Sequence, residues 1–394
     1  ADALSDLLFG QFHDILAGSS VVEVEAQALQ RLHHGLEIVD RLRTRVFFAL
    51  LSGQPRAAEG EYPIFVHNPY PFPVTGTVWC EFQPPEPNQN PAVFLQPELT
   101  DVEGVPVVSQ LEKESCNIQA DQRKRVVFRT TLPPSCTTRY SCRIREVPRP
   151  SSAGAGQSAH MSGTFVHRTA DSEIEIDTET GLIAAYRVKG LDYVRPGVFR
   201  PLVIRDSADP WGMKVRGFRN VIGEFTLMTP AEAADFAGVD APGLAPVRII
   251  EDGPVRTIVE ALMRYGRSAL VLRYVLPQAG TEIEVQARVS WCETDTMLKL
   301  SVPTPFEAMR VRSQVAYGVE HHRREGEELV WHAWLAAESG DGSRVLTIIN
   351  DGTYGFDYAQ GELRLSCLRS PAYAGHPVDD VTPIVRQDRV EPRV

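Results

Sequence analysis

The chain has 394 residues, 43% of them hydrophobic and 23% charged, which is the composition of a globular protein with two or three domains of roughly 100–200 residues each. Its formal net charge is −11, so it has no basic surplus to neutralise phosphates, and this argues against a nucleic acid as partner. No apolar run approaches the roughly 20 residues that a membrane-spanning helix needs, so no membrane is expected as partner either.

The start of the chain and its cysteines bear on the compartment. The first residues, from Ala1 to Leu4, include no basic segment before an apolar stretch, so no signal peptide is indicated. Six cysteines are scattered along the chain without a C-x-x-C pair. This spacing favours reduced, mostly buried thiols over a disulfide framework. On that ground we expect a cytoplasmic protein.

Residues 1–54 have the pattern of helices. A short helix is predicted before Gly10, and Ser20 with Glu23 has the spacing of a capping box at the start of a second helix. Apolar residues then recur every three or four positions as far as Leu50, which predicts one helix of about 30 residues. Its apolar stripe needs partners to cover it. The segment is therefore predicted to be the end of a helical bundle domain.

The period changes from 3.6 to 2 after the helices, and residues 60–147 are predicted to form a small β sandwich. Pro- and Gly-rich turns separate its short apolar runs. The strands expected there are 64–66, 76–82, 105–108, 125–130 and 138–144. Residues 148–163 are polar and of low complexity, the composition of a linker.

Residues 164–394 are predicted to form a second, larger β domain. Residues 281–291 carry an apolar side chain at every second position, as in a long strand of an antiparallel sandwich with one face on the core. The other strands expected there are 173–177, 298–302, 344–349 and 362–368. The predicted fold class is therefore mainly β with an N-terminal helical segment.

The segment richest in residues suited to metal binding or catalysis is Gln11-Phe-His-Asp14, which is followed by a turn that contains Gly18. A His beside an Asp between two helices is well placed to project into a cleft. By these residues alone, His13 is a metal ligand, a base or a packed polar residue. Asp14 is its neighbour, a substrate-binding carboxylate or a helix cap. The spacing by itself does not decide between these roles.

The wider string from Leu8 to Val24 resembles the helix–turn segment of bacterial family 38 α-mannosidases, where Gln, one aromatic residue or His, His and Asp precede Gly and Ser or Thr. Ala17 stands where bacterial relatives commonly have Pro, a difference that leaves the chemistry untouched. Further strings follow in the family's order and spacing, among them His67-Asn-Pro69, Thr180-Gly-Leu182, Arg205 to Gly212, Asp252-Gly-Pro-Val-Arg256, Val289 to Glu293, Asn350 to Gly355 and Leu368 to Pro371.

The resemblance implies a retaining α-mannosidase with a zinc ion, acting on mannose-containing oligosaccharides. It implies that His13 is a zinc ligand from the helical domain and that Asp14 binds sugar hydroxyls. It also implies a galactose-mutarotase-like β supersandwich for residues 164–394. The nucleophile, the acid/base residue and the other ligands belong to an N-terminal α/β domain of the family, so no catalytic residue is expected in this chain. We expect a C-terminal fragment that is inactive and metal-free by itself, with a suspected truncation after Val394.

Other polar and aromatic clusters have less specific patterns. Asp206, Asp209 and Trp211 share a loop; Asp209 and Trp211 are predicted to line a sugar subsite, and loop anchoring is an equal alternative. Neighbouring histidines cannot readily chelate together on a strand or a helix. His321-His322 is therefore interpreted as solvated, and His33-His34 is likewise given no metal-binding role. Two tryptophans, Trp331 and Trp334, are expected to pack in the sandwich.

Two other functions remain open on the sequence. One is a free-standing carbohydrate-binding β-sandwich protein, which predicts saturable sugar binding without metal. The other is a structural or oligomerisation module, which predicts concentration-dependent oligomers without sugar affinity. A homo-oligomer is compatible with every one of these functions.

Overall fold

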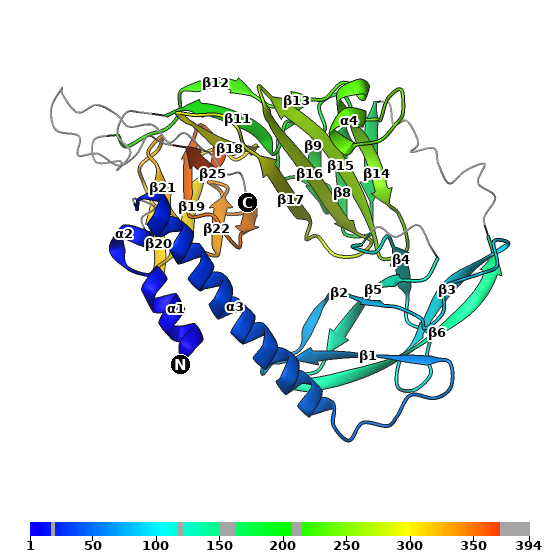
Figure 1. Ribbon diagram of the computed structural model, residues 1–394. Coiled ribbons are helices and arrows are strands. Elements are labelled where there is room, and N and C mark those ends of the chain that lie inside the picture. The colour runs from blue at the N-terminus through cyan, green and yellow to red at the C-terminus, as the bar shows by residue number, and fades with distance from the viewer. Residues whose placement is uncertain (17–19, 117–120, 150–162, 207–214, 371–394) are drawn as a thin grey trace. The chain divides into compact units, whose positions relative to one another are not determined.

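The computed structural model describes residues 1–16, 20–116, 121–149, 163–206 and 215–370 (Figure 1). These residues divide into a helical unit, which ends at Ala58, and a β unit, which runs from Glu59 to Ser370. The prediction of a mainly β protein with an N-terminal helical segment is confirmed. No helix in this part of the chain combines the length and the apolar character needed to cross a membrane.

Three helices make up the helical unit: α1 (Asp2–Gly10), α2 (His13–Leu16) and α3 (Val22–Leu51). The Leu32 side chain of α3 packs against Gly10 of α1, where an added Cβ would lie 3.2 Å from Leu32 Cδ2. Asp6 on α1 lies 2.8 Å from Nδ1 of His34 on α3, which ties the two helices together beside their apolar contact. The predicted long helix is confirmed.

The predicted capping box at the start of α3 is wrong. The N-cap residue is Val21, and no side chain caps the helix. The Ser20 hydroxyl instead donates to the carbonyl oxygen of Asp14, at 2.7 Å. Because that hydroxyl closes the turn before α3, the helix starts one residue later than the capping-box spacing predicts.

The apolar stripe of α3 is largely exposed among the described residues. Ala28 and Gly35 are the buried residues of this helix. The exposed apolar side chains along it are Val22, Leu29, Leu36, Val39, Leu42, Val46, Phe48 and Leu50. A stripe of this extent exceeds the ordinary scatter of single apolar residues on a protein surface.

The small sandwich consists of two three-stranded antiparallel sheets, in the orders β1-β6-β3 and β2-β5-β4. Its strands are β1 (Glu61–Asn68), β2 (Val74–Phe82), β3 (Val93–Thr100), β4 (Ser109–Glu112), β5 (Lys124–Leu132) and β6 (Cys136–Pro148). Its buried core contains Ile64, Leu99, Val126, Phe128, Tyr140 and Cys142. The strand predicted at 105–108 is misplaced, since β4 begins at Ser109. No prediction covered β3, an edge strand whose Pro97 obscures the strand pattern.

The large β region contains four antiparallel sheets around one main apolar core. The sheet orders are β10-β9-β8-β7, β12-β11-β18-β25-β24-β21, β13-β15-β16-β17 with β14 on β15, and β20-β19-β22-β23. The strands are β7 (Thr164–Arg168), β8 (Ser172–Asp177), β9 (Leu182–Val188), β10 (Leu191–Asp192), β11 (Arg200–Arg205), β12 (Val221–Glu224), β13 (Thr226–Leu227), β14 (Val247–Glu251), β15 (Arg256–Tyr265), β16 (Ser268–Pro277), β17 (Glu284–Ser290), β18 (Thr296–Pro303), β19 (Arg310–Val315), β20 (Gly318–His322), β21 (Leu329–Val330), β22 (Trp334–Glu338), β23 (Val345–Ile349), β24 (Gly355–Ala359) and β25 (Glu362–Ser370). One helix, α4 (Pro230–Ala237), is inserted between strands.

The predicted linker and the cysteines can be compared with the structure. β6 extends to Pro148 and β7 begins at Thr164, while residues 150–162 lie outside the described residues. All six cysteines are free thiols, but only Cys142 is buried, and Cys116 is exposed. The expectation of mostly buried thiols is therefore wrong in degree. Burial raises the pKa of the Cys142 thiol to about 12.

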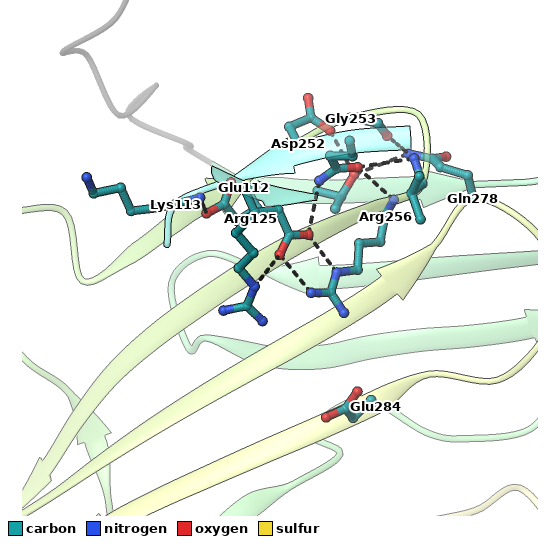
Figure 2. A network of polar contacts seen from close by, with 12 residues as sticks. Glu112, Lys113, Arg125, Asp252, Gly253, Arg256, Gln278 and Glu284 are labelled. Carbon is teal, nitrogen blue, oxygen red and sulfur yellow. Dashed lines mark hydrogen bonds and ion pairs between the residues drawn. The ribbon is translucent and has the colours of Figure 1, made fainter. Parts of the chain in front are cut away.

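A polar network joins the small sandwich to the large β region (Figure 2). Glu112 on β4 accepts two hydrogen bonds from Arg256 on β15, from Nε and from Nη2, both at 2.7 Å. Gln110 accepts from the backbone amides of Val255, at 3.1 Å, and Arg256, at 3.0 Å. A glycine is required at position 253, because an added Cβ there would lie 2.5 Å from the Gln110 side-chain oxygen. All these contacts are buried, so β4 is fixed to the β14–β15 turn.

His322, at the end of β20, is a buried histidine whose Nδ1 has no hydrogen-bond partner among the described residues and lies 3.8 Å from the Glu320 carboxylate. Its Nε2 shares a 2.8 Å hydrogen bond with the Ser313 hydroxyl, and its ring meets Phe356 edge-on at 5.2 Å. Burial lowers the pKa of His322; Arg324 and His321 act in the same direction, and Glu320 opposes them. The neutral imidazole is therefore the form that the fold stabilises.

This histidine predicts acid sensitivity. A lowered folded-state pKa gives stability that is complete above the unfolded value of about 6.5 and is lost as the pH falls below it. Between about pH 7 and pH 5.5, His322→Gln should reduce the fall in unfolding free energy by up to about 1.4 kcal/mol per pH unit. The exposed neighbour offers a control, since His321→Gln removes only a minor contribution to the lowered pKa of His322 and should change that slope much less. Equal slopes for wild type and His322→Gln, measured by denaturant unfolding, would contradict this origin.

Candidate functional site

The candidate site lies where the chain turns between α1 and α3. α1 ends as the Gln11 amide donates to the carbonyl oxygens of Leu7 and Leu8, at 3.2 and 3.3 Å. The single turn of α2 then begins at His13. The Phe12 and His13 rings lie 4.3 Å apart, which restricts the orientation of the imidazole. The sequence Gly-Gln-Phe-His-Asp thus places both functional side chains on a short, hydrogen-bonded turn.

His13 and Asp14 project together from this turn into solvent. His13 Nε2 lies 3.5 Å from Asp14 Oδ2, and the two side chains are 78% and 55% exposed. The backbone of Asp14 is held by the Ser20 hydroxyl at 2.7 Å. A nitrogen donor and an anionic oxygen are therefore held close enough for one bound group to contact both.

The same geometry shows how far these residues fit a metal ion. An accessible imidazole beside a carboxylate is a donor set that zinc accepts, but a stable zinc site has about four ligands. Within the described residues, no three His, Cys, Asp or Glu side chains come together in a group that could hold a metal. His13 therefore fits as one ligand of a site whose other ligands come from elsewhere.

Of the second predicted cluster, Asp206, Asp209 and Trp211, the structure describes Asp206. Asp209 and Trp211 lie outside the described residues. Asp206 is described, and both of its carboxylate oxygens accept from Arg369 Nε, at 3.0 and 2.9 Å. Its side chain is fully buried. Asp206 therefore anchors the chain at the end of β11, and both alternatives for Trp211 stay predictions.

The two histidine pairs do not chelate in the described structure. On β20, His321 is exposed and His322 is buried, so the two point to opposite faces as predicted. The interpretation of the pair as solvated is wrong for His322. On α3, His34 is paired with Asp6 and has a structural role. The expected packing of Trp331 is confirmed by its burial, whereas Trp334 is half-buried.

Sequence reasoning missed the polar junction between the β regions. It noted the string from Asp252 to Arg256 without assigning a role, and it passed over Gln110 and Glu112. Two large polar residues two positions apart on a strand share one face of that strand. The alternation of Gln110 and Glu112 with apolar residues was the signal that their face lies outside the apolar core.

Comparison with known families agrees with this fold. Residues 208–381 match the family described as the glycosyl hydrolases family 38 C-terminal domain. This match agrees with the resemblance of the chain's motifs to family 38. A search among curated proteins finds no match.

Two solved structures share the fold over nearly the whole chain. One is an α-mannosidase from Enterococcus faecalis V583, with a TM-score of 0.68 and 12% identity over 94% of this chain and 47% of that one. The other is a family 38 glycosyl hydrolase protein from Enterococcus faecalis, with a TM-score of 0.65 and 13% identity over 94% of this chain and 48% of that one. The chain thus spans about half the length of these structures.

Proposed function

We propose that this chain is part of a zinc-assisted, retaining α-mannosidase that hydrolyses terminal α-mannosides. The observation that carries the proposal is the exposed pair His13 and Asp14, 3.5 Å apart, in a chain that matches the family 38 C-terminal domain. One structural relative is an α-mannosidase, which supports the same substrate class.

Each residue of the pair has one role in this proposal. His13 holds the metal through a neutral ring nitrogen, the form that binds zinc. Asp14 accepts hydrogen bonds from sugar hydroxyls, since an ionised carboxylate is an acceptor with two oxygens. The bound zinc supplies Lewis acidity and a template for the sugar. The Ser20 hydroxyl holds the backbone of Asp14 in the turn that carries both side chains.

The rest of the machinery is proposed to lie in the part of the relatives that this chain does not span. A retaining glycosidase needs a nucleophile and an acid/base carboxylate about 5–5.5 Å apart. Hydrolysis then proceeds in two displacements through those carboxylates. By itself the chain is accordingly proposed to be inactive and metal-free.

The exposed face of α3 supports membership of a larger protein. Leu36, Val39, Leu42 and Val46 are about half exposed or more on a helix with few buried residues. An isolated helix with such a face gains little from propensity and needs packing on the apolar side. We propose that further parts of the parent protein cover it. A free-standing carbohydrate-binding protein would have no evident use for this face.

The proposal is tested on the full-length parent with aryl glycosides. We expect turnover of the α-mannoside and none of the β-mannoside, and no turnover of either by the present chain alone. Asp14→Ala should lower kcat/KM for the α-mannoside roughly 10–100-fold, the cost of losing hydrogen bonds to a charged acceptor. Asp40→Ala, an exposed carboxylate on α3, is the control and should be unaffected. An inactive parent, or an Asp14→Ala variant with full activity, would contradict the proposal.

A further inference from the structure

The indole of Trp79 lies in the open on the outward side of β2. It is 56% exposed, while its strand neighbours Val78 and Cys80 pack against the core of the small sandwich. Side chains alternate between the faces of a strand, so Trp79 occupies the face away from that core. The indole of Trp79 is therefore not part of the apolar core of the small sandwich.

The residues beyond Trp79 along this face are polar, while its own cross-strand partner, Val127, is fully buried. Two positions along β2, on the same face and roughly 7 Å away, lies Thr77, which pairs across the strands with Arg129. The next pair on that face is Thr75 with Thr131, whose hydroxyls share a 2.8 Å hydrogen bond. An aromatic ring is therefore followed along the sheet by hydroxyls and a guanidinium group.

The orientation of the indole is fixed from one side. The Arg125 guanidinium lies over the ring, 4.6 Å from its centroid, and Arg125 Nε lies 3.8 Å from Glu112. Glu112 is in turn held by both contacts to Arg256, as Figure 2 shows for Glu112 between the two arginines. The Arg125 guanidinium, which lies beside Glu112, thus covers one face of the indole. The exposed area of Trp79 belongs to the rest of the ring. A ring held in this way loses little conformational freedom on binding.

We propose that Trp79 is a stacking platform for a pyranose ring of a mannose-containing glycan, with Thr77 and Arg129 bonding its hydroxyls. A pyranose presents a face of C–H groups and a rim of hydroxyls. Its C–H face covers an exposed aromatic ring, which removes apolar area of both from water. Its hydroxyls need donors and acceptors at the edge, and threonine and arginine supply them. The choice of mannose rests on the proposed function; the platform itself rests on the geometry.

A second exposed aromatic pair is a natural control. Tyr70 and Phe72 are 54% and 55% exposed, and they stack on each other with centroids 5.3 Å apart and planes at 14°. Their loop is held by the Asn68 side chain, which donates to the Phe72 carbonyl at 2.9 Å. In this pair each ring covers one face of the other, whereas one face of Trp79 is covered by a guanidinium group.

The experiment titrates the present chain with α-1,2-, α-1,3- and α-1,6-linked mannobiose and, for comparison, cellobiose, by calorimetry and ligand-observed NMR. At least one mannobiose should bind with a Kd of roughly 0.1–5 mM. Trp79→Ala should weaken that binding at least roughly tenfold. Trp79→Phe, which keeps a stacking ring, should lose much less, and Phe72→Ala should stay within about twofold of wild type. Unfolding midpoints confirm that each variant is folded.

Several results would overturn the proposal. They are no mannobiose binding by wild type up to about 20 mM, equal losses for Trp79→Ala and Phe72→Ala, or binding of cellobiose alone. Self-association that Trp79→Ala abolishes, without sugar binding, would identify a protein contact instead. The outcome is separable from the proposed function: a parent active on α-mannosides beside a chain that does not bind sugar rejects only the platform. Trp79-dependent mannobiose binding beside a parent without α-mannosidase activity rejects only the proposed function.

Discussion

Arg256→Met is expected to destabilise the β unit by about 3–5 kcal/mol, the range for removing one partner of a buried ion pair. Glu112 and Arg256 are almost fully buried, with side-chain exposures of 3% and 10%. Without the guanidinium, the carboxylate of Glu112 would remain buried with Arg125, at 3.8 Å, as its remaining cationic neighbour. Most of the cost is therefore the unpaired charge rather than the lost contact.

Two further variants separate this cause from general disruption of β15. Arg264 lies on the same strand but pairs with Glu232 at the surface, so Arg264→Met should barely shift the unfolding midpoint. Adding Glu112→Leu to Arg256→Met removes both charges and should recover much of the loss. Urea unfolding followed by circular dichroism measures all of them. A double variant no more stable than Arg256→Met would show that the buried charge is not the cause.

Lys299→Met is expected to cost a similar amount, about 3–5 kcal/mol, in the centre of the large β region. The Lys299 ammonium is fully buried on β18 and donates to Asp357 at 2.6 Å and to Glu328. Asp357 is itself fully buried, and its second partner is Arg219. Without the ammonium, the carboxylates of Asp357 and Glu328 lie close together with Arg219 as the nearby cation. At least one of the two carboxylates is then desolvated without a cationic partner, which is unfavourable.

A surface arginine of the same region serves as the comparison. Arg310 pairs with Glu338 where both side chains are more accessible, so Arg310→Met should have a much smaller effect on denaturant unfolding. Lys299→Met and Asp357→Leu together should be more stable than Lys299→Met by itself. Similar unfolding midpoints for Lys299→Met and Arg310→Met would contradict the assigned role of this network.

The elements found from the sequence are those with one buried face. α3 showed its stripe at 3.6-residue spacing, and residues 281–291 showed strict alternation, which β17 (Glu284–Ser290) confirms. The longest buried strand was missed for the opposite reason. Eight consecutive residues of β15, from Arg256 to Met263, are buried on both faces, so no alternation marks the strand.

Helix starts were predicted less well than helices. Ser20 and Glu23 have capping-box spacing, yet the Ser20 hydroxyl bonds Asp14 instead. A true capping box, Thr229 with Glu232, begins α4 and went unnoticed within a β region. A four-residue pattern does not report which of several nearby acceptors a hydroxyl reaches.

The candidate site was predictable in part. His13 and Asp14 are neighbours in sequence, so their proximity follows from local structure. Glu112 and Arg256 are separated by 144 positions, and no periodicity reports such a pairing. The same limit applies to Trp79, whose exposure follows from the course of the sheet rather than from its own strand pattern.

The proposal that His13 is a zinc ligand of an α-mannosidase is tested by measuring zinc content and α-mannoside turnover together on the full-length parent. Wild type should hold close to one zinc per chain, and His13→Ala should lose most of the metal and most of the turnover. His33→Ala, an exposed histidine on α3, should keep both. A His13→Ala parent that retains its zinc and its turnover would contradict the zinc-ligand role of His13 and leave the His–Asp turn with a structural role.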